Sequence, residues 1–457
     1  MHPVFDTAAT KAVPILFVTS ATFDEVIKTL DAHARAFVTA AGFEAKAGKH
    51  LLVPDADGKL AAVLFGLEAA DDPARNLFRP GALVDLLPAG SYRFGNAPHD
   101  ARLGALAFAL GTYQFTRYRK GSERNVKLVV PEGVDGEDVS RIAEAVTLCR
   151  DLINTPSNDM GPAELEEAAR KLAGEHGAAI NVVSGEALEK GFPLVHAVGK
   201  GSKRAPRLID LTWGKDSDPK ITLVGKGVAF DTGGLDIKPS SGMLNMKKDM
   251  GGAATALALA HMIMARGLKV RLRVLIPAVE NSISGISFRP RDVYVSRKGL
   301  SVEIGNTDAE GRLILADALA LADEEKPALI VDFATLTGAA RVAVGPELAP
   351  FFTDDDQLAG ELMAAGTAEF DPTWRLPLWR PYDGLLDSKV ADFNNVGSGG
   401  HGGAITAALF LRRFVEAKSW LHLDIFAWTA ANKPGRPEGG ELQSARALYA
   451  LFKARYS

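Results

Sequence analysis

Continuous apolar runs of strand length alternate with longer helix-patterned segments from residue 161 to the end of the chain. Strands buried on both faces read as unbroken apolar runs, and the helices between them return the chain for the next parallel strand. The alternation therefore predicts an α/β domain with a mostly parallel central sheet covered by helices. Binding sites in such sheets gather beyond the carboxyl ends of the strands. The expected strands are residues 207–211, 221–224, 270–276, 329–333 and 420–425, and the expected helices are residues 162–175, 253–265, 312–324, 404–415 and 442–454.

A chain of 457 residues is too long for one ordinary hydrophobic core, so we expect two domains. Residues 1–134 form a smaller α/β domain. It should contain a helix over residues 23–39 and a hairpin of strands 50–54 and 60–65 around an Asp-Ala-Asp-Gly turn. We expect residues 135–160 to form a connecting helix and a linker. The helix should end at a cluster of helix-breaking residues. The larger domain then spans residues 161–457.

Charge and cysteine content narrow the class of protein. The net charge of -4 gives no basis for nucleic-acid binding, which needs a basic surface. The single cysteine, Cys149, lies in a helical pattern among apolar residues and reads as a core residue. It cannot form an intrachain disulfide, which favours a reducing, cytoplasmic setting. Residues 1–11 are polar and the apolar run 13–18 is short, unlike a secretory signal, and no run reaches the roughly 18 apolar residues of a membrane helix.

The octapeptide Asn-Thr-Asp-Ala-Glu-Gly-Arg-Leu at residues 306–313 precedes one of the expected helices. Taken alone, it fits a helix start. Thr307 and Glu310 have the spacing of a capping box, and the helix dipole would favour Asp308 in this position.

A second acidic segment, residues 224–254, is rich in glycine, which suits a backbone that turns sharply close to a ligand. Asp231 follows an apolar run and is expected at the end of a strand. Alone, Asp249 would be an N-cap, and Lys226 and Lys238 would be solvated surface lysines. Carboxylates brought to one point repel each other unless a cation neutralises them. The two acidic segments together predict a divalent-metal site, and oxygen ligands suit Mn²⁺, Mg²⁺ or Zn²⁺.

The two segments resemble the paired signatures of the leucyl aminopeptidase (cytosol aminopeptidase) family. Residues 306–313 match the family octapeptide in full. The upstream spacing also matches: Lys226 is followed by an aspartate five residues on, a lysine seven further and an aspartate eleven further. The resemblance covers about residue 154 to the C-terminus. It implies a metal-dependent aminopeptidase with a small macro-like α/β domain before the catalytic domain.

The resemblance also implies roles for individual residues. Two divalent ions, Mn²⁺ or Zn²⁺, would be bound, with Asp231 and Glu310 bridging them. The lysine ligand would have to be neutral, a state that a nearby dication favours. Lys238 would stabilise the oxyanion of the tetrahedral intermediate, and Arg312 would hold a bicarbonate that relays the proton. The implied metal ligands are Lys226, Asp231, Asp249, Asp308 and Glu310.

The family's substrate side-chain pocket maps onto Met246, Thr335, Leu336, Gly338 and the stretch 424–429. Here the chain departs from the expected Asp-Ile-Ala-Gly and reads Asp-Ile-Phe-Ala, with a phenylalanine at position 426. A Phe426 ring facing the pocket would narrow it and shift the preference away from a plain leucine profile. A ring packed into the core would leave the pocket unchanged, and the sequence alone leaves both possibilities open.

Other functions fit the sequence less well. A metal phosphoesterase would more naturally offer histidine ligands, but the nine histidines include no His-Glu-x-x-His pattern, and His422 in an apolar strand reads as structural. A non-catalytic scaffold or DNA-binding protein on a peptidase fold would be favoured by loss of a ligand, yet all five positions are filled. Gly225-Lys226-Gly227 lacks the spacing of a phosphate-binding loop. The resemblance further implies a homohexamer that acts on peptides with a free N-terminus, with no membrane partner.

Overall fold

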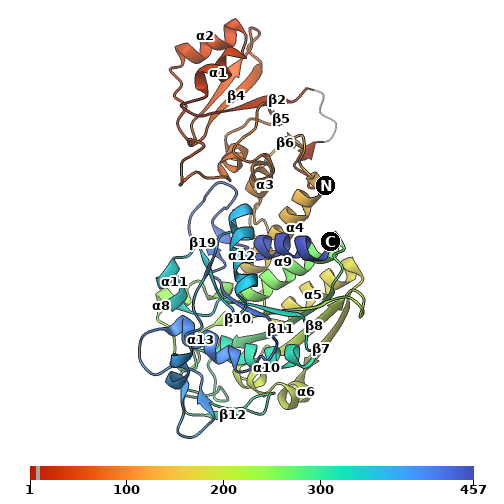
Figure 1. Cartoon of the computed structure of the whole chain (residues 1–457), viewed down its shortest axis with the longest axis vertical. Helices are drawn as coiled ribbons and strands as arrows, with labels where there is room; N and C mark the ends of the chain where they lie inside the picture. Colours follow the sequence, from red (N-terminus) through yellow and green to blue (C-terminus); the bar gives the residue numbers. More distant parts are fainter. Residues whose placement is uncertain (7–10) are drawn as a thin grey trace. The chain divides into compact units, whose positions relative to one another are not determined.

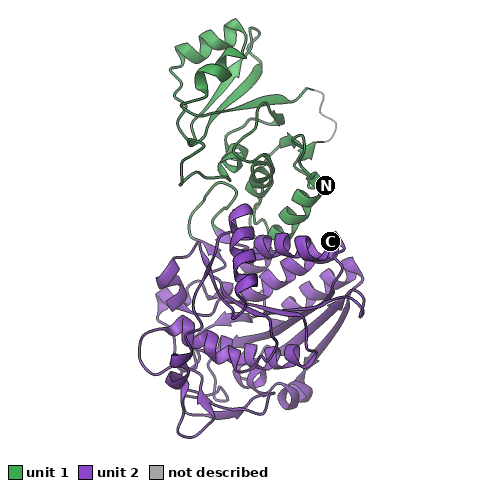
Figure 2. Cartoon of the chain, viewed as in Figure 1, with its two compact units in different colours: residues 1–147, 430–438 green, residues 148–429, 439–457 purple. Residues whose placement is uncertain are grey.

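The computed structural model describes residues 1–6 and 11–457. The chain forms two compact units, Met1–Thr147 with Ala430–Glu438 and Leu148–Thr429 with Gly439–Ser457 (Figure 2). Residues 7–10, part of the polar N-terminal stretch that is unlike a secretory signal, lie outside the described residues. None of the described helices is long and apolar enough to cross a membrane.

The first unit contains a six-stranded sheet in the order β1-β6-β5-β2-β4-β3. Strand β2 pairs in parallel with β4 and β5, and β3 and β4 form the predicted antiparallel hairpin. In its turn, Asp55 Oδ1 accepts hydrogen bonds from the backbone N–H of Asp57 (2.9 Å) and Lys59 (2.8 Å), which fixes the reversal of the chain. The strands are β1 (Phe5–Asp6), β2 (Val13–Val18), β3 (His50–Pro54), β4 (Leu60–Gly66), β5 (Gly90–Phe94) and β6 (Val126–Val129).

The single helix predicted over residues 23–39 is wrong, because the structure has two helices there, α1 (Phe23–Lys28) and α2 (Ala32–Ala40). Asp31 causes the break. Its side chain accepts a hydrogen bond from the backbone N–H of Ala34 at 2.8 Å and so starts a new helix. The unit also contains η1 (Arg79–Asp85) and α3 (Ala101–Gly111), and α4 (Gly136–Asn154) runs along the chain from the first unit into the second.

The larger unit is built on a nine-stranded sheet, in which β16-β15-β18-β14-β9-β11-β8-β7 follow one another and β10 pairs with β11. The central pairs β18–β14, β14–β9 and β9–β11 are parallel, and the antiparallel pairs lie towards the edges. This arrangement confirms the predicted mostly parallel sheet. Its strands are β7 (Ala179–Ser184), β8 (Arg207–Trp213), β9 (Lys220–Gly225), β10 (Gly227–Asp231), β11 (Arg271–Asn281), β14 (Leu329–Ala334), β15 (Ala349–Phe352), β16 (Thr373–Arg375) and β18 (Trp420–Asp424).

Helices cover both faces of this sheet (Figure 1). Helix α9 packs with α5 and α14, and helix α10 packs with α7 and α13, while α9 and α10 both contact the central strands. The helices are α5 (Pro162–His176), α6 (Gly185–Gly191), α7 (Pro193–Gly199), α8 (Ser240–Met243), η2 (Met246–Met250), α9 (Gly251–Arg266), α10 (Glu310–Glu324), α11 (Gly338–Val344), α12 (Asp356–Ala368), η3 (Arg380–Leu386), α13 (Gly403–Arg412) and α14 (Ala445–Tyr456). Two smaller sheets comprise β12 (Val293–Val295), β13 (Ser301–Glu303), β17 (Phe393–Asn394), β19 (Trp428–Thr429) and β20 (Gly439–Gly440).

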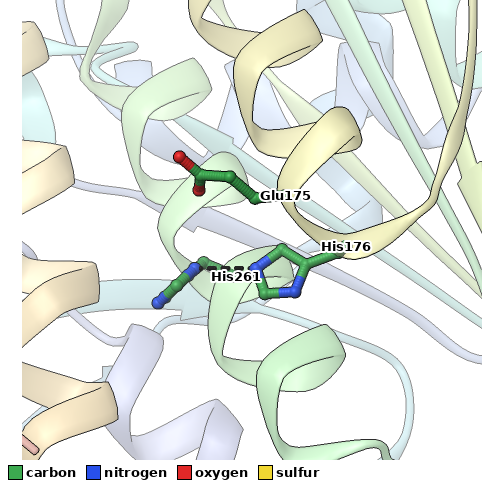
Figure 3. Close-up of side chains that lie close together, drawn as sticks. All are labelled: Glu175, His176 and His261. Atoms are coloured by element: carbon green, nitrogen blue, oxygen red, sulfur yellow. Dashed lines mark hydrogen bonds between the residues drawn. The ribbon is translucent and has the colours of Figure 1, made fainter.

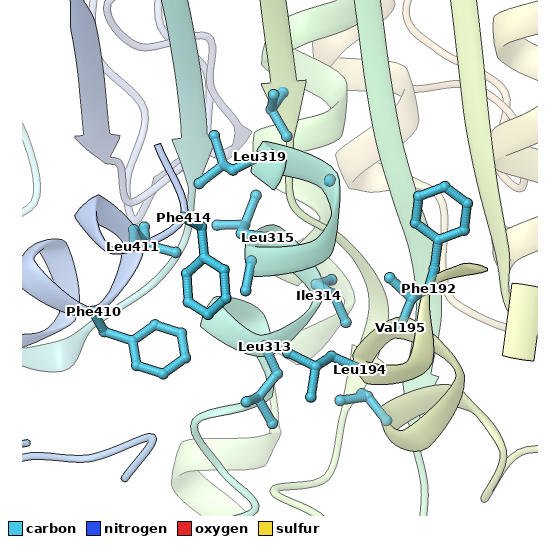
Figure 4. Packing of buried hydrophobic residues seen from close by; sticks show 14 of the residues in the cluster. Phe192, Leu194, Val195, Leu313, Ile314, Leu315, Leu319, Phe410, Leu411 and Phe414 are labelled. Atoms are coloured by element: carbon cyan, nitrogen blue, oxygen red, sulfur yellow. The ribbon is translucent and has the colours of Figure 1, made fainter. Parts of the chain in front are cut away.

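Helix α10 is buried along most of its length, which fixes the position of its N-terminus. Figure 4 shows its apolar side chains between residues of α7 on one side and of α13 on the other. Leu313, Leu315 and Leu319 are fully buried in this cluster, and burying one such side chain contributes about 1.5–3 kcal/mol. The first residue of α10, Glu310, is therefore held by a well-packed helix.

Candidate metal centre and substrate pocket

Three acidic side chains meet at one point in the larger unit. Asp231 is the last residue of β10, Asp308 lies in the loop before α10, and Glu310 is the first residue of α10. One carboxylate oxygen from each lies within 4.8 Å of the other two. Asp231 and Glu310 are buried, and Asp308 is partly exposed. The end of a strand and the start of a helix thus share one site, as the sequence predicted.

Lys226 connects this group to Asp249. It directly follows β9, and its Nζ lies 2.8 Å from Asp249 Oδ2 and 3.0 Å from Glu310 Oε1. The ammonium also donates a hydrogen bond to the carbonyl of Thr335 at 3.0 Å. Gly311 leaves room for this side chain, because a Cβ at that position would lie 2.5 Å from Lys226 Cε. The octapeptide glycine is therefore needed for the close approach of a lysine that lies far away in the sequence.

Lys238 lies on the other side of the acidic group. Its Nζ is 2.9 Å from Asp231 Oδ2 and forms a second ion pair with Asp308 Oδ1. The loop before it turns through Gly233, whose φ of +87° belongs to the left-handed region that glycine tolerates best. A Cβ at Gly233 would also lie 2.5 Å from the carbonyl oxygen of Asp236, so the loop requires glycine for two reasons.

The donor set fits divalent cations. Asp249 Oδ2, Asp308 Oδ1 and Glu310 Oε1 are buried and accept no hydrogen bond. Each is held instead in an ion pair with a lysine ammonium, Asp249 and Glu310 with Lys226 and Asp308 with Lys238. Oxygen donors of this kind are preferred by hard divalent ions, so these three atoms are suitable ligands.

The crowding of the carboxylates raises their affinity for protons. Burial and the negative charge of Asp231 raise the pKa of Glu310 to about 8 and that of Asp308 to about 6. Burial also raises the pKa of Asp249. A bound cation would reverse these shifts, because an adjacent positive charge favours the ionised carboxylate.

Burial lowers the pKa of Lys226, but the carboxylates of Asp249, Glu310 and Asp231 raise it by more, so the net shift is upward. In the protein without ions, Lys226 is therefore an ammonium that neutralises the acids around it. The neutral form expected of a lysine ligand requires the ions to supply that positive charge.

Thr307 does not form the capping box considered from the sequence, and the N-cap position of α10 is Ala309. The Thr307 hydroxyl donates to the carbonyl of Gly233 at 2.6 Å and accepts a hydrogen bond from the backbone N–H of Asp236 at 2.9 Å. These bonds join the two acidic segments, a long-range contact that local spacing does not reveal. The N-cap alternative for Asp249 is also wrong, because its Oδ1 accepts a hydrogen bond from the Thr335 hydroxyl at 2.7 Å.

Arg312 is buried in the first turn of the helix that starts at Glu310. Its Nη1 donates to the carbonyl of Asn395 at 2.7 Å, whereas its Nε is buried without a hydrogen-bond partner. Burial lowers the pKa of Arg312 to about 10, so the guanidinium stays charged at neutral pH. Arg312 is not among the described residues that line the cavity at this site.

A cavity of about 170 Å³ opens beside the acidic group. The five predicted metal ligands and Lys238 line one part of it. The predicted substrate-binding residues line the rest, so the structure brings both sets together in one cavity. Phe426 faces this cavity and is partly exposed, so its ring does not pack into the core. The predicted substrate-binding residues in the lining are Met246, Thr335, Leu336, Gly338 and Phe426.

Two cationic side chains that the sequence did not single out also line the cavity. Lys248 Nζ lies 4.5 Å and Arg341 Cζ lies 4.7 Å from the centroid of the Phe426 ring. Lys248 is 4% exposed, and burial lowers the pKa of its ammonium to about 8, against the opposing charge of Asp249. Its place next to Asp249 in the sequence was a weak signal, whereas nothing in the sequence pointed to Arg341.

Both parts of the chain match families of known proteins. The cytosol aminopeptidase family, catalytic domain, matches residues 147–449, and the M17 aminopeptidase, N-terminal domain, matches residues 13–131. The chain belongs to the cytosol aminopeptidase family. It is 42% identical over 373 residues to a probable cytosol aminopeptidase of Sinorhizobium fredii, a match that covers 77% of this chain and 74% of the relative.

Solved structures agree with this membership of the cytosol aminopeptidase family. The cytosol aminopeptidase of Coxiella burnetii is 46% identical, with a TM-score of 0.94 and coverage of 98% of both chains. The bottromycin maturation enzyme BotP in complex with Mn is 34% identical, with a TM-score of 0.86 and coverage of 97% of this chain and 99% of that one. As a family member, the chain is a metal-dependent aminopeptidase, which confirms the predicted family, fold and enzyme class.

This cytosol aminopeptidase family member has a second group of possible ligands away from the cavity, formed by Glu175, His176 and His261 (Figure 3). The two histidines come from α5 and α9, and His176 Nε2 lies 3.0 Å from His261 Nδ1. A hydrogen bond between the two rings accounts for this approach, and Glu175 is exposed.

Burial raises the pKa of the Cys149 thiol, and burial inside the unit keeps it from acting as a nucleophile.

Proposed function

We propose that the chain removes the N-terminal residue from peptides by means of a water held between two divalent ions. One observation carries this proposal. Five potential ligands converge on one cavity, and carboxylate oxygens of Asp231, Asp308 and Glu310 lie within 4.8 Å of one another. Lys226, Asp249 and the two bridging carboxylates would hold one ion, and Asp308 with the same bridging pair, Asp231 and Glu310, would hold the other.

Bound ions would acidify a water to a pKa near 7, polarise the scissile carbonyl and take up the free α-amine of the peptide. The protein's own groups would do the rest. Lys238 would donate to the oxyanion of the tetrahedral intermediate, and its contacts with Asp231 and Asp308 support this position. Arg312 would hold a bicarbonate that accepts and returns the proton, and its partnerless Nε supports an anion there.

The N-terminal side chain of the substrate would enter the part of the cavity formed by Met246, Thr335, Leu336, Gly338 and Phe426. The Phe426 ring would narrow this pocket and shift the preference away from a plain leucine profile. The related enzyme BotP forms a complex with Mn, which supports Mn²⁺ as one of the ions to test, beside Zn²⁺.

Assembly and compartment are part of the same proposal. The family resemblance supports a homohexamer, for which light scattering should give six times the mass of the 48.5 kDa chain. A monomer mass would contradict it. The names of the relatives and the single buried cysteine support a cytoplasmic location.

The test is hydrolysis of a panel of free and N-acetylated dipeptides and amides, with added Mn²⁺ or Zn²⁺ and again after chelation. We expect metal-dependent release of the first residue from free N-termini alone. A Glu310→Gln variant should lose turnover and bind fewer ions, measured by calorimetric titration. Cleavage of acetylated peptides, or cleavage that survives chelation, would contradict the proposal.

A further inference from the structure

Lys248 is a buried cation without a carboxylate partner. Its ammonium forms no hydrogen bond, and no ion pair within 4.0 Å, with any residue that the structure describes; its contact is with the Phe426 ring. The two nearest carboxylates are engaged elsewhere. Asp249 is bound by Lys226 and Thr335. Asp424 accepts hydrogen bonds from the backbone N–H of Leu336 and Thr337, at 2.9 and 3.1 Å.

Burying an unpaired charge is costly, and proteins keep one where a ligand supplies the partner or where the group has a function. A role in metal binding does not explain why a buried cation is kept at position 248, because a second ammonium beside the metal ligands would repel bound cations. Its position in the lining of the cavity, facing Phe426, instead makes it available to a molecule in the cavity.

A second cation, the exposed Arg341, reaches the same ring from a different element. It lies on α11, lines the same cavity and contacts the same ring, and it forms no ion pair with any described residue. The charge of Arg341 disfavours the ammonium of the buried Lys248, so an anion in this part of the cavity would stabilise Lys248 and would be attracted by both groups. Both cations contact the Phe426 ring, whose face attracts positive charge.

The anion must come from the group that enters this part of the cavity. Under the proposed function, that group is the side chain of the N-terminal residue, because Lys248 and Arg341 lie with Met246, Leu336 and Gly338 in the lining. We propose that this pocket selects peptides whose N-terminal residue has an anionic side chain, glutamate or aspartate. The proposal rests on the proposed aminopeptidase function and adds the class of substrate.

Pairs of substrates of equal size separate the effect of the side-chain charge from the effect of side-chain size. Hydrolysis of Glu-Ala against Gln-Ala, and of Asp-Ala against Asn-Ala, compares side chains of equal size with and without a charge. We expect kcat/KM for Glu-Ala to exceed that for Gln-Ala by about tenfold or more, the scale of one charge-assisted hydrogen bond. In Lys248→Met and in Arg341→Met, this ratio should fall towards one, whatever the overall level of activity.

Lys247→Met is a matched control. Lys247 is the neighbouring residue on η2, but it does not line the cavity and donates to the carbonyl of Asn154 at 2.7 Å. Its replacement removes the same charge one position away and should leave the Glu/Gln ratio unchanged. Circular dichroism would establish that each variant is folded. A wild-type ratio near one, or a ratio that persists in both folded pocket variants, would overturn the inference while leaving the aminopeptidase function intact.

A second readout separates the two proposals. Calorimetric titration of the metal-loaded protein with L-glutamate and L-glutamine measures binding of the products without turnover. Tighter binding of glutamate supports the pocket inference even if no dipeptide is cleaved, a result that would overturn the proposed function alone. Equal binding of the two amino acids overturns the pocket inference.

Discussion

Lys226 Nζ lies 3.0 Å from Glu310 Oε1, and both side chains are almost completely buried. The octapeptide and the upstream segment thus meet through a buried ion pair. Removing one partner of a buried pair leaves an uncompensated charge and costs about 3–5 kcal/mol.

We therefore expect Lys226→Met to lower the free energy of unfolding of the chelated protein by about 3–5 kcal/mol. Adding Glu310→Gln should restore part of this loss, because the double variant has neither charge of the pair. Calorimetric unfolding of the single and double variants in the presence of a chelator measures both effects. Strictly additive losses would contradict the coupling.

Lys238→Met should lower kcat by about a hundred- to a thousandfold, as loss of an oxyanion donor does. KM should change little, because the interaction arises in the transition state. Steady-state kinetics with saturating Mn²⁺ measures both constants, and metal analysis verifies that the ions are retained. The exposed Lys418→Met serves as a control. A rise in KM at constant kcat would show that Lys238 binds the substrate instead.

Gly311→Ala should weaken metal binding, because its Cβ would lie 2.5 Å from Lys226 Cε and displace that side chain. Gly360→Ala on α12 is the matched control. It is also a helical glycine, but a Cβ there meets nothing within 4 Å, so alanine should stabilise the helix by about 0.5–1 kcal/mol. Titration with Mn²⁺ measures the metal affinity of both variants, and thermal unfolding measures their stability. Unchanged metal affinity in Gly311→Ala would refute the packing argument.

Phe426→Ala should change the ranking of N-terminal residues. It widens the pocket and removes the ring that both Lys248 and Arg341 contact. Relative kcat/KM for leucine, methionine and phenylalanine substrates should rise against that for alanine. A panel of aminoacyl amides measures this ranking, and an unchanged order would show that the ring does not shape selectivity.

His422 should make stability depend on pH. Its Nδ1 lies 2.5 Å from Asp332 Oδ1; burial lowers the pKa of His422, but the Asp332 carboxylate raises it more. Because the folded pKa lies above the ordinary 6.5, the stabilisation is fully present below pH 6.5 and is lost as the pH rises through the folded value. The difference in melting temperature between wild type and His422→Asn should therefore shrink from pH 6 to pH 9. A difference that grows with pH would contradict this sign.

Most of the candidate metal centre was predictable from the sequence because its acids belong to local motifs. Asp231 ends a strand and Glu310 starts a helix, and apolar patterning predicts where strands and helices end. Parallel strands place such ends at one edge of a sheet. The family octapeptide then linked the two segments, and the mostly parallel sheet followed from continuous apolar runs.

Local spacing failed where a side chain bonds to a distant segment. Thr307 has the spacing of a capping residue, yet its hydroxyl binds Gly233 and Asp236. Asp31 interrupts a helix that apolar periodicity continues, because its carboxylate competes for backbone N–H groups.

The sequence by itself determined the fold class, the family and the acids of the candidate metal centre, since these depend on periodicity and on motifs within short segments. The tertiary structure alone decided that Lys248 and Arg341 lie against Phe426 in the pocket. These three side chains come from η2, α11 and the segment after β18, and no local pattern records which of them meet. Whether a charged side chain is solvated or buried against a distant ring depends on packing, which only the folded chain defines.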